Sequence, residues 1–366
     1  MYGYMDHVLR TFYKATEWND DNVYSHIIET SQNLIDFDLP KGCNITLSSQ
    51  PTPTSCSSYT LSNNGFLNGS IFYTYCTREL DPIPASKYIP LRQTIASYRI
   101  LTPLKKLIDP MYWEVWKGGV RVDTKDTLLY GRIYLPQNSV EAMIVRRLLP
   151  ASQLVIKSVS DTHIKNGGAV TFTLQRNLPS YSNEYIYSTH ESLVGFRGVY
   201  NFGAQQRIKD PSISSRLTIG GEIYYSILAK SPGLSAALRY TAQSAYTGTP
   251  LTMALMCNPL MGHLAAMYSL TAGGHSFGSR IEFNVYSYES DLSVGCELWR
   301  SQEKEEETTP IFSTIKASTS LKTRSLNMLW EGRFKDLLVS TGVGLTALPS
   351  QTLELSQLGV SIQYSS

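Results

Sequence analysis

The sequence predicts an all-β fold, a transmembrane β-barrel with a short N-terminal helix and a second helix in a loop. Three observations support this prediction. Apolar and polar residues alternate at period two along most of the chain, as in strands with one apolar and one polar side. About 17 such strands can be counted, most of them ~8 to 12 residues long, the length that crosses a bilayer at a tilt. The apolar side of the clearest strands carries no charged residue.

Composition limits the class of protein. Of the 366 residues, 42% are hydrophobic, only 17% are charged, and 24 are tyrosines. Mean hydropathy is −0.16, and no apolar run reaches the roughly 18 residues of a transmembrane helix. Such a composition is typical of soluble all-β proteins and equally of membrane barrels, whose alternating strands escape hydropathy plots. A formal charge of +2 argues against nucleic acid as a partner.

The N-terminal region differs from the rest of the chain. Residues 1–17 place apolar side chains at helical spacing, which predicts a short amphipathic helix that either packs on the body of the protein or, in a barrel, lies along or inside the lumen. The following segment up to residue 33 is polar and predicts a linker. We therefore expect residues 1–33 to form a helix and linker, and residues 34–366 to form the barrel. The N-terminus has neither the layout of a secretory signal nor the composition of a matrix presequence.

Both ends of the predicted sheet can be located. Residues 34–39 and 44–49 alternate and predict the first pair of strands, whereas residues 77–126 predict long loops around one or two strands. The last strand, residues 353–364, alternates almost to the C-terminus. A bare edge strand exposes unpaired backbone groups. We therefore expect the last strand to close the barrel on the strand near Leu34.

Two helical features are predicted between strands. Ser139 to Leu149 reads as a helix, because Ser139 can act as an N-cap and a proline follows directly. This helix is either an amphipathic connector or a means of presenting Arg146 and Arg147 to a partner. Residues 325–333 predict a helical turn between two strands.

The strands separate two chemically different faces. In residues 217–230 one face is apolar from Leu217 to Ala229, and the other carries Glu222. A water-filled lumen and a lipid-facing exterior would produce this pattern. A β-sandwich would also alternate, but such long hairpins favour a barrel. Aromatic residues near strand ends predict girdles at a membrane interface: Tyr130, Tyr134, Tyr286, Tyr288, Trp299 and Tyr364.

Motifs for catalysis are weak. Residues 274–278 match G-x-S-x-G, but a nucleophile elbow needs a strand before the turn and a helix after it, and here two antiparallel strands flank a glycine turn. Glu222, Glu282 and Glu297 could supply a catalytic pair. Lumen-facing charges balanced by Arg280 and other cations explain them more simply. Histidines and cysteines lack ligand spacing, so we predict no enzyme and no catalytic, cofactor or metal site.

Several stretches are specific in combination. They are YMDHVLRTFY (Tyr4 to Tyr13), NGSIFYTY (Asn68 to Tyr75), YGRIYLP with EAMIVRRLLP (Tyr130 to Pro150), RYTAQSAYTGTPLT (Arg239 to Thr252), NPLMGH (Asn258 to His263), EFNVYSYESDLSVGCELW (Glu282 to Trp299), LNMLWEGR (Leu326 to Arg333) and the terminal GVSIQY. Through them the chain resembles, over nearly its whole length, the fungal mitochondrial distribution and morphology protein 10 family. It departs from the family pattern after Trp299, where relatives often carry a long polar insertion.

The resemblance implies a mitochondrial-porin-like barrel of about 19 strands in the mitochondrial outer membrane. An odd number would make the first and last strands parallel. The family is non-enzymatic and affects mitochondrial morphology and lipid exchange. Its implied partners are the lipid-transfer subunits of the ER–mitochondria encounter structure (ERMES), the insertase and peripheral subunits of the sorting and assembly machinery (SAM complex), TOM components transiently, and membrane lipids. The rival readings are a metabolite-conducting porin with the same fold and a soluble all-β binding protein.

Two outward-facing pairs are candidate partner surfaces. Tyr73 and Tyr75 lie on one face of an early strand, and each tyrosine offers an apolar body with a polar tip. Ile281 and Phe283 lie on one face of a late strand. We expect one pair to contact ERMES and the other the SAM complex. The alternative is that all four are ordinary lipid-facing residues, which every barrel strand has.

The last strand also carries a candidate targeting signal. Gln357, Gly359, Ile362 and Tyr364 follow the order polar-x-Gly-x-x-hydrophobic-x-hydrophobic. This order resembles the β-signal by which mitochondrial barrels are handed to the sorting machinery. An insertase could pair with such a regular edge strand by β-augmentation.

Overall fold

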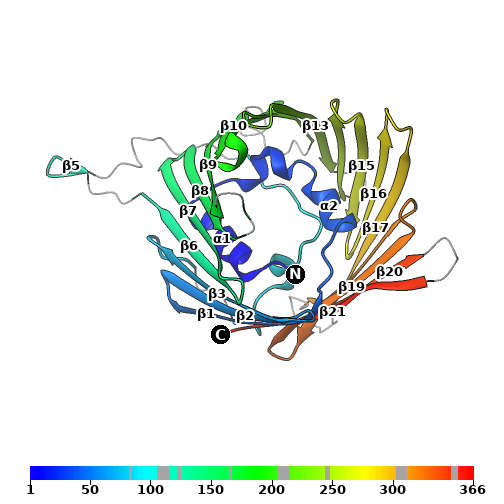
Figure 1. The fold of residues 1–366 in the computed structure, drawn as a ribbon, viewed down its shortest axis with the longest axis horizontal. Coiled ribbons are helices and arrows are strands. Elements are labelled where there is room, and N and C mark those ends of the chain that lie inside the picture. Colours follow the sequence, from blue (N-terminus) through cyan, green and yellow to red (C-terminus); the bar gives the residue numbers. More distant parts are fainter. Residues whose placement is uncertain are drawn as a thin grey trace.

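In the computed structural model, one sheet of 19 strands closes into a barrel around helices from the N-terminal region (Figure 1). The predicted fold class is therefore confirmed. Residues are described in the ranges 1–81, 85–104, 116–121, 125–162, 164, 167–203, 215–243, 248–301, 311–347 and 353–366. Among these residues, no helix has both the length and the apolar character needed to cross a membrane.

Each barrel strand pairs antiparallel with the next one along the chain. The strands are β1 (Gly42–Thr52), β2 (Ser55–Asn63), β3 (Leu67–Cys76), β6 (Thr127–Leu135), β7 (Ser139–Leu149), β8 (Ser152–Ser160), β9 (Gly168–Asn177), β10 (Tyr181–Ser188), β11 (Leu193–Asn201), β12 (Arg216–Ser226), β13 (Ser231–Gln243), β14 (Pro250–Asn258), β15 (His263–Ala272), β16 (His275–Asn284), β17 (Ser290–Ser301), β18 (Ile311–Ser320), β19 (Ser325–Phe334), β20 (Leu337–Ala347) and β21 (Leu353–Ser365). A separate hairpin of β4 (Trp116–Lys117) and β5 (Val120–Arg121) lies outside this sheet.

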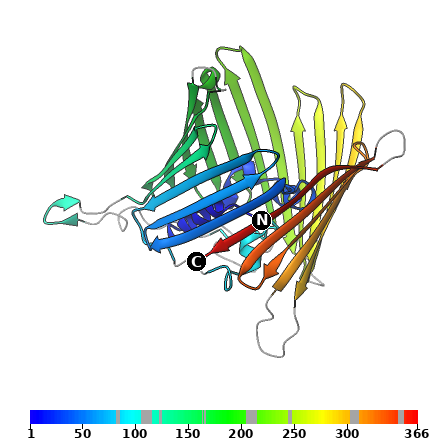
Figure 2. The same ribbon diagram turned by 60° about the horizontal axis from the view of Figure 1, so that its bottom comes forward.

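The first and last strands close the barrel, and they run parallel. Their register extends from Gly42 opposite Gly359 to Ser48 opposite Ser365. Figure 2 shows red β21 beside blue β1 at this seam. Closure by the last strand and the parallel pairing are both confirmed. The closing partner is β1, however, and not a strand near Leu34.

Alternation places apolar side chains outside and polar ones inside, as predicted. On β3, for example, Ile71, Tyr73 and Tyr75 are exposed on the outer face, whereas Ser70 and Thr74 are buried on the inner face. Two of the residues predicted to form interfacial girdles, Tyr130 and Tyr134, face the lumen. Tyr134 donates a hydrogen bond to inner-face Glu141, and Tyr130 packs against inner-face Phe72, because the polar members of β6 lie on the lumen side.

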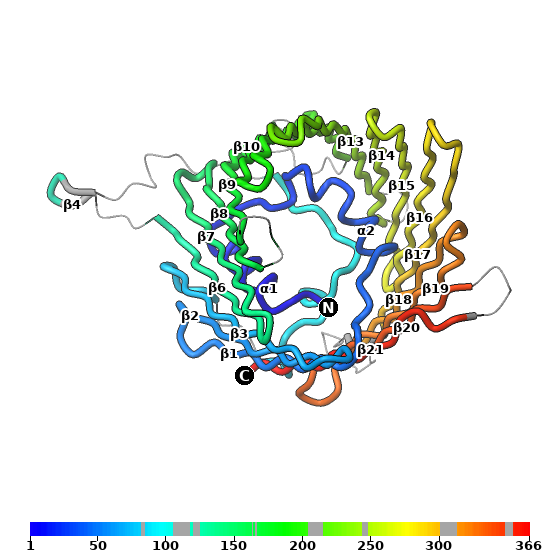
Figure 3. Tube along the Cα trace, viewed as in Figure 1, coloured from blue at the N-terminus to red at the C-terminus, as the bar shows by residue number. Residues whose placement is uncertain are grey.

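The barrel interior is occupied by helices, which Figure 3 traces inside the ring of strands. They are α1 (Tyr4–Ala15), η1 (Asp20–Asn22), η2 (Tyr24–His26), α2 (Glu29–Ile35) and α3 (Leu91–Thr94), and a further turn, η4 (His190–Ser192), connects β10 to β11. The predicted N-terminal helix is confirmed as α1. Its Val8 and Phe12, one helical turn apart, are fully buried against wall residues such as Cys56 and Leu128. A hydrophobic core therefore lies where the pattern predicted a water-filled lumen.

The strand predicted at residues 34–39 is wrong. Leu34 and Ile35 are the last residues of α2, and both are buried against the barrel wall. Adjacent residues of a strand would point to opposite sides, whereas a helix lying flat on a sheet can bury both. Strand β1 begins only at Gly42. The division into residues 1–33 and a barrel domain remains a prediction.

The helix predicted at Ser139 to Leu149 is also wrong, because this segment is strand β7, paired with β6 and β8. Its β-branched residues favour a strand, and both neighbours supply backbone partners. Arg146 is exposed on the outer face, whereas Arg147 is buried inside and stacks 4.4 Å above the Trp18 ring. The two arginines therefore cannot present themselves together to a partner.

The helical turn predicted at residues 325–333 is strand β19 as well. Both neighbouring strands, β18 and β20, pair with it, and two consecutive buried residues, Glu331 and Gly332, interrupt its alternation. Residues 77–126 contain α3 and the short β4–β5 hairpin, in keeping with the predicted loops. Residues 82–84, 105–115 and 122–124 of that region lie outside the described residues, as do residues 302–310 after Trp299.

Candidate functional site

Two chain segments lie inside the barrel along its wall (Figure 1), and together we call them the luminal insert: residues 1–41 and residues 85–104. The second segment follows β3 and contains α3. The two segments are joined to each other, because the Tyr2 amide donates to the Thr94 carbonyl over 2.7 Å. Both are also bonded to the wall. Lys316 of β18 donates to the Ala96 carbonyl, and Arg333 of β19 donates to the Ile89 carbonyl.

The insert lies close to the wall because inward-facing glycines leave room for its backbone. A Cβ atom added at Gly295 of β17 would overlap the Leu34 carbonyl oxygen, and one added at Gly359 of β21 would overlap that of Pro40. Any side chain at either position would therefore displace the insert. Gly220, Gly278, Gly342 and Gly344 face the same insert from other strands.

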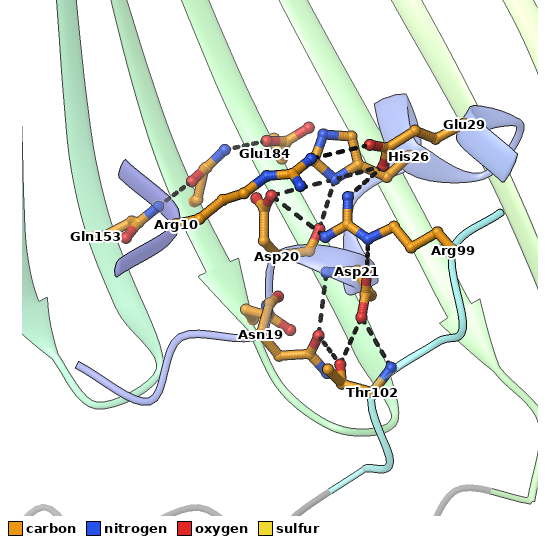
Figure 4. A network of polar contacts seen from close by, with 12 residues as sticks. Arg10, Asn19, Asp20, Asp21, His26, Glu29, Arg99, Thr102, Gln153 and Glu184 are labelled. Atoms are coloured by element: carbon orange, nitrogen blue, oxygen red, sulfur yellow. Dashed lines mark hydrogen bonds and ion pairs between the residues drawn. The ribbon is translucent and has the colours of Figure 1, made fainter. Parts of the chain in front are cut away.

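An ion-pair network holds the insert together, with Arg99 at its centre (Figure 4). Arg99 Nε lies 2.5 Å from Asp21 Oδ1, and Arg99 Nη1 pairs with Glu29. A third carboxylate, Asp20, lies 3.7 Å from Arg99 Nη2 and 3.4 Å from His26 Nδ1. A single arginine of the second segment thus joins three acids of the first segment.

Asp21 is the most buried acid of this network, with a side-chain exposure of 3%. Thr102 donates to Asp21 Oδ2 twice, from its amide over 2.9 Å and from its hydroxyl over 2.6 Å. Burial alone would raise the pKa of Asp21, but Arg99 and these two hydrogen bonds outweigh it and hold the pKa below its usual range. The carboxylate is therefore ionised at neutral pH and fixed in place.

Hydrogen bonds and ion pairs link polar side chains in a row along the inner face of the wall from β8 to β13, and the insert contacts this row. Arg197 Nε donates to Glu222 over 3.1 Å, and Ser235 donates to the same carboxylate over 2.6 Å. Tyr24 of the insert meets Ser235 over 2.6 Å. The other members, in wall order, are Gln153, Gln175 and Glu184.

The acids considered as a catalytic pair are separated and paired with different partners. Glu222 binds Arg197, Glu282 lies 2.9 Å from Arg280 Nε, and fully buried Glu297 accepts from the Tyr98 amide over 3.3 Å. The predicted balance by Arg280 and other cations is confirmed for Glu222 and Glu282. Arg280 also pairs with Asp36 of the insert.

Ser276 of the G-x-S-x-G match lies within β16, buried on the inner face. Its hydroxyl donates to the Thr271 hydroxyl over 2.9 Å across the hairpin. Gly273 takes the positive φ of +61° that the preceding turn requires. The predicted turn at Gly273 and Gly274 is confirmed, whereas Gly278 lies within β16.

The four candidate partner-binding residues all lie on the outer surface. Tyr73 and Tyr75 on β3 are 55% and 44% exposed, and Ile281 and Phe283 on β16 are 57% and 38% exposed. Seven strands lie between β3 and β16 by the shorter way round, through β1 and β21. Figure 1 shows the two strands on opposite sides of the barrel. The structure therefore brings each pair together and separates the pairs from each other.

The candidate β-signal has an inner and an outer side. Gln357 Nε2 donates to the Leu39 carbonyl over 2.7 Å, and Gly359 lies beneath Pro40. Ile362 and Tyr364 lie on the other face of β21, where Tyr364 is exposed. The two inner residues thus contact the luminal insert.

Sequence reasoning missed the ion-pair network. Asp20, Asp21 and Glu29 lie in what was read as a polar linker, and Arg99 lies in a region without alternation. Charged residues in a non-periodic segment resemble a solvated loop. No sequence signal indicates that the two segments meet inside a barrel.

Comparison with known proteins gives one consistent result. The family model described as "Mitochondrial distribution and morphology protein 10" matches residues 1–314 and 307–366. Proteins of that name from Yarrowia lipolytica and Phaeosphaeria nodorum are 44% and 40% identical to this chain. The alignments cover all of this chain and 99% and 100% of the relatives. A third protein of that name, from Candida albicans, is 34% identical over an alignment of 477 positions, which includes insertions.

Replacing Arg99 with leucine should release the luminal insert. Three acids would lose their shared cation, and breaking such a buried pair costs about 3 to 5 kcal/mol. The lowered pKa of Asp21 gives stability that is present at neutral pH and lost as pH falls through that pKa. The natural chain should therefore lose protection of residues 17–35 on acidification, whereas the variant, which lacks the charge that lowers this pKa, should be less protected at neutral pH and should depend less on pH. Hydrogen exchange of these residues measures both effects.

Arg10→Leu is the matched control. Arg10 lies 3.7 Å from Glu29 and its side chain is 35% exposed, so its loss should cost below about 1 kcal/mol. Equal protection losses in the two variants would contradict the central role of Arg99.

Proposed function

Because the chain belongs to the mitochondrial distribution and morphology protein 10 family, we propose that it is a non-enzymatic barrel of the mitochondrial outer membrane that anchors the ERMES complex and associates with the SAM complex. Family membership makes it a mitochondrial protein with a role in mitochondrial distribution and morphology. In the proposed function it holds ERMES lipid-transfer subunits at the membrane and assists late TOM and β-barrel assembly, and so affects lipid exchange.

The luminal insert, bonded to the inner wall, is the observation that carries this proposal. A barrel that serves as a pore needs its interior for solutes, whereas this interior holds α1, α2 and residues 85–104. Ion pairs and hydrogen bonds fix the insert to itself and to the wall. The outer surface and the barrel ends remain available for interactions, as an anchor or adaptor requires.

Membrane insertion is supported by the chemistry of the outer face. Exposed large apolar residues lie on strands all round the barrel, for example Leu61, Ile133, Tyr185, Ile223 and Ile315. Such a surface is far larger than the apolar patches that soluble monomers expose to water. In a bilayer it would face acyl chains, while the closed ladder pairs the backbone groups.

The two outer pairs support separate binding surfaces on one barrel. Tyr73 and Tyr75 supply two neighbouring hydroxyl groups on β3, and Ile281 and Phe283 supply a purely apolar patch on β16. Their chemistry and their positions differ, so two partners could bind at once without overlapping. The proposal assigns one surface to ERMES and the other to the SAM complex.

The partner surfaces can be tested by a pull-down from detergent-solubilised mitochondria. Each double variant, Tyr73→Ala/Tyr75→Ala or Ile281→Ala/Phe283→Ala, should lose one set of partners by at least about tenfold and keep the other, since a few buried side chains carry most of an interface's binding energy.

Matched controls exist on β10 and β11. Tyr185 and Tyr187 are 53% and 45% exposed, and Val194 and Phe196 are 46% and 40% exposed. Their double alanine variants should retain both sets of partners. The two-surface proposal fails if both test variants also retain both sets.

The metabolite porin is the alternative function, because it shares the fold. It predicts large, anion-selective currents from the purified full-length chain in a planar bilayer. Since the insert occupies the lumen, we expect currents well below those of a mitochondrial porin measured in the same bilayers. Large anion-selective currents would favour the porin.

The proposed β-signal is best tested at its outward residues. Gly359 also accommodates the Pro40 backbone, so its replacement would disturb the folded barrel as well as any signal. Ile362→Ala/Tyr364→Ala leaves the inner contacts intact and should leave the chain extractable from mitochondrial membranes by alkali. Leu355→Ala/Leu358→Ala, on the same strand, should insert normally. Normal insertion of the first variant would refute the signal.

A further inference from the structure

The seam between β1 and β21 is the weakest join that the barrel geometry provides. Every other join is antiparallel, whereas this one is parallel, and parallel ladders are slightly less stable per residue. It is also the only join between strands from opposite ends of the chain. A barrel that opens laterally would open at such a seam.

The luminal insert contacts this seam at both of its ends. At one end Gln357 donates to the Leu39 carbonyl, and Gly359 lies directly beneath Pro40. At the other end Ser86 meets Ser365. The two contacts come from the two different segments of the insert, 1–41 and 85–104.

The Ser86 contact is built from three hydrogen bonds. The Ser86 amide donates to the Ser365 carbonyl over 3.0 Å, and the Ser86 hydroxyl donates to the same oxygen over 2.9 Å. The Ser365 amide donates to the Ser86 hydroxyl oxygen over 2.7 Å. Ser86 is fully buried, so water cannot replace these partners when the contact breaks.

We propose that the luminal insert is an internal clasp that keeps the β1–β21 seam closed. Leu39 and Pro40 hold one end of β21 while Ser86 holds the other, both from inside the barrel. Parallel pairing makes this seam slightly less stable than an antiparallel one. The contacts of the luminal insert with β21 offset that loss. In the context of the proposed function, the chain acts as a permanently closed anchor, not as a lateral gate for other strands.

The clasp also implies an order of assembly. Both of its parts belong to the first 104 residues, whereas β21 is the last strand of the chain. The insert must occupy the lumen before or while β21 arrives, because Gly359 and Ser365 find their inner partners only there. Strand β21 therefore pairs with the edge of β1 and packs against the luminal insert in the same step.

Hydrogen exchange of the purified full-length barrel in detergent micelles tests the clasp. Ser86→Ala removes the hydroxyl that both donates and accepts, and should speed exchange of amides in residues 359–365 and 42–48 by about tenfold. Amides of β7 to β9 should be unchanged. Ser86 lies outside the proposed β-signal, so insertion should be normal.

The matched control is Ser269→Ala. Ser269 is also fully buried and donates to a backbone carbonyl, that of Thr252 over 3.3 Å, but it lies on β15 away from the seam. In the Ser269→Ala variant, the amides of residues 359–365 and 42–48 should exchange as fast as they do in the natural chain. The clasp would be overturned if the exchange rate of the seam amides were unchanged in Ser86→Ala, or if exchange rose equally in all strands of the barrel.

A disulfide across the seam gives a second measurement. In a chain whose other four cysteines are replaced, the natural Cys43 and Val360→Cys lie opposite each other in register, and Val360 lies outside the proposed β-signal. Their oxidation should restore slow exchange in the Ser86→Ala chain, and failure to do so would contradict the proposal. Partner binding is not measured in either experiment, so the clasp and the adaptor function can fail independently.

Discussion

Closure of the sheet is the constraint on which the rest of this structure depends. Nineteen strands leave two edges unless β1 and β21 pair, and the odd number forces that pair to be parallel. Unpaired edges are a liability in water and cannot be tolerated in lipid. Pairing of β1 with β21 meets this constraint, and both segments of the luminal insert reach that seam from inside, through Leu39, Pro40 and Ser86.

The insert and the wall fit each other through two kinds of interaction. Glycines at Gly295 and Gly359 allow backbone to lie directly on strands, and α1 buries Val8 and Phe12 in an apolar core. Arg99 then joins three carboxylates from a segment far away in the sequence. Such partners compensate buried charges that would otherwise be costly. With the insert inside the barrel, the proposed function uses the outer surface and the barrel ends for recognition.

Alternation predicted most of the sheet correctly because the environments inside and outside the barrel differ strongly. The same rule failed where a segment satisfied two periods at once. Residues 139–149 contain a helix-like order of apolar residues, but β6 and β8 provide backbone partners on both sides. Leu34 is predicted from the sequence to begin the first strand, but Leu34 and Ile35 are adjacent buried residues of α2. In both cases tertiary contacts outweighed a weak local preference.

The sequence by itself determined the barrel class, the outward positions of Tyr73, Tyr75, Ile281 and Phe283, and the last strand as the closing strand. These features depend on local periodicity, which each strand carries in its own residues. Only the tertiary structure decided that the lumen is filled, that Asp21 meets Arg99, and that Ser86 meets Ser365. Those contacts join residues distant in sequence through segments without periodicity, so no local pattern encodes them.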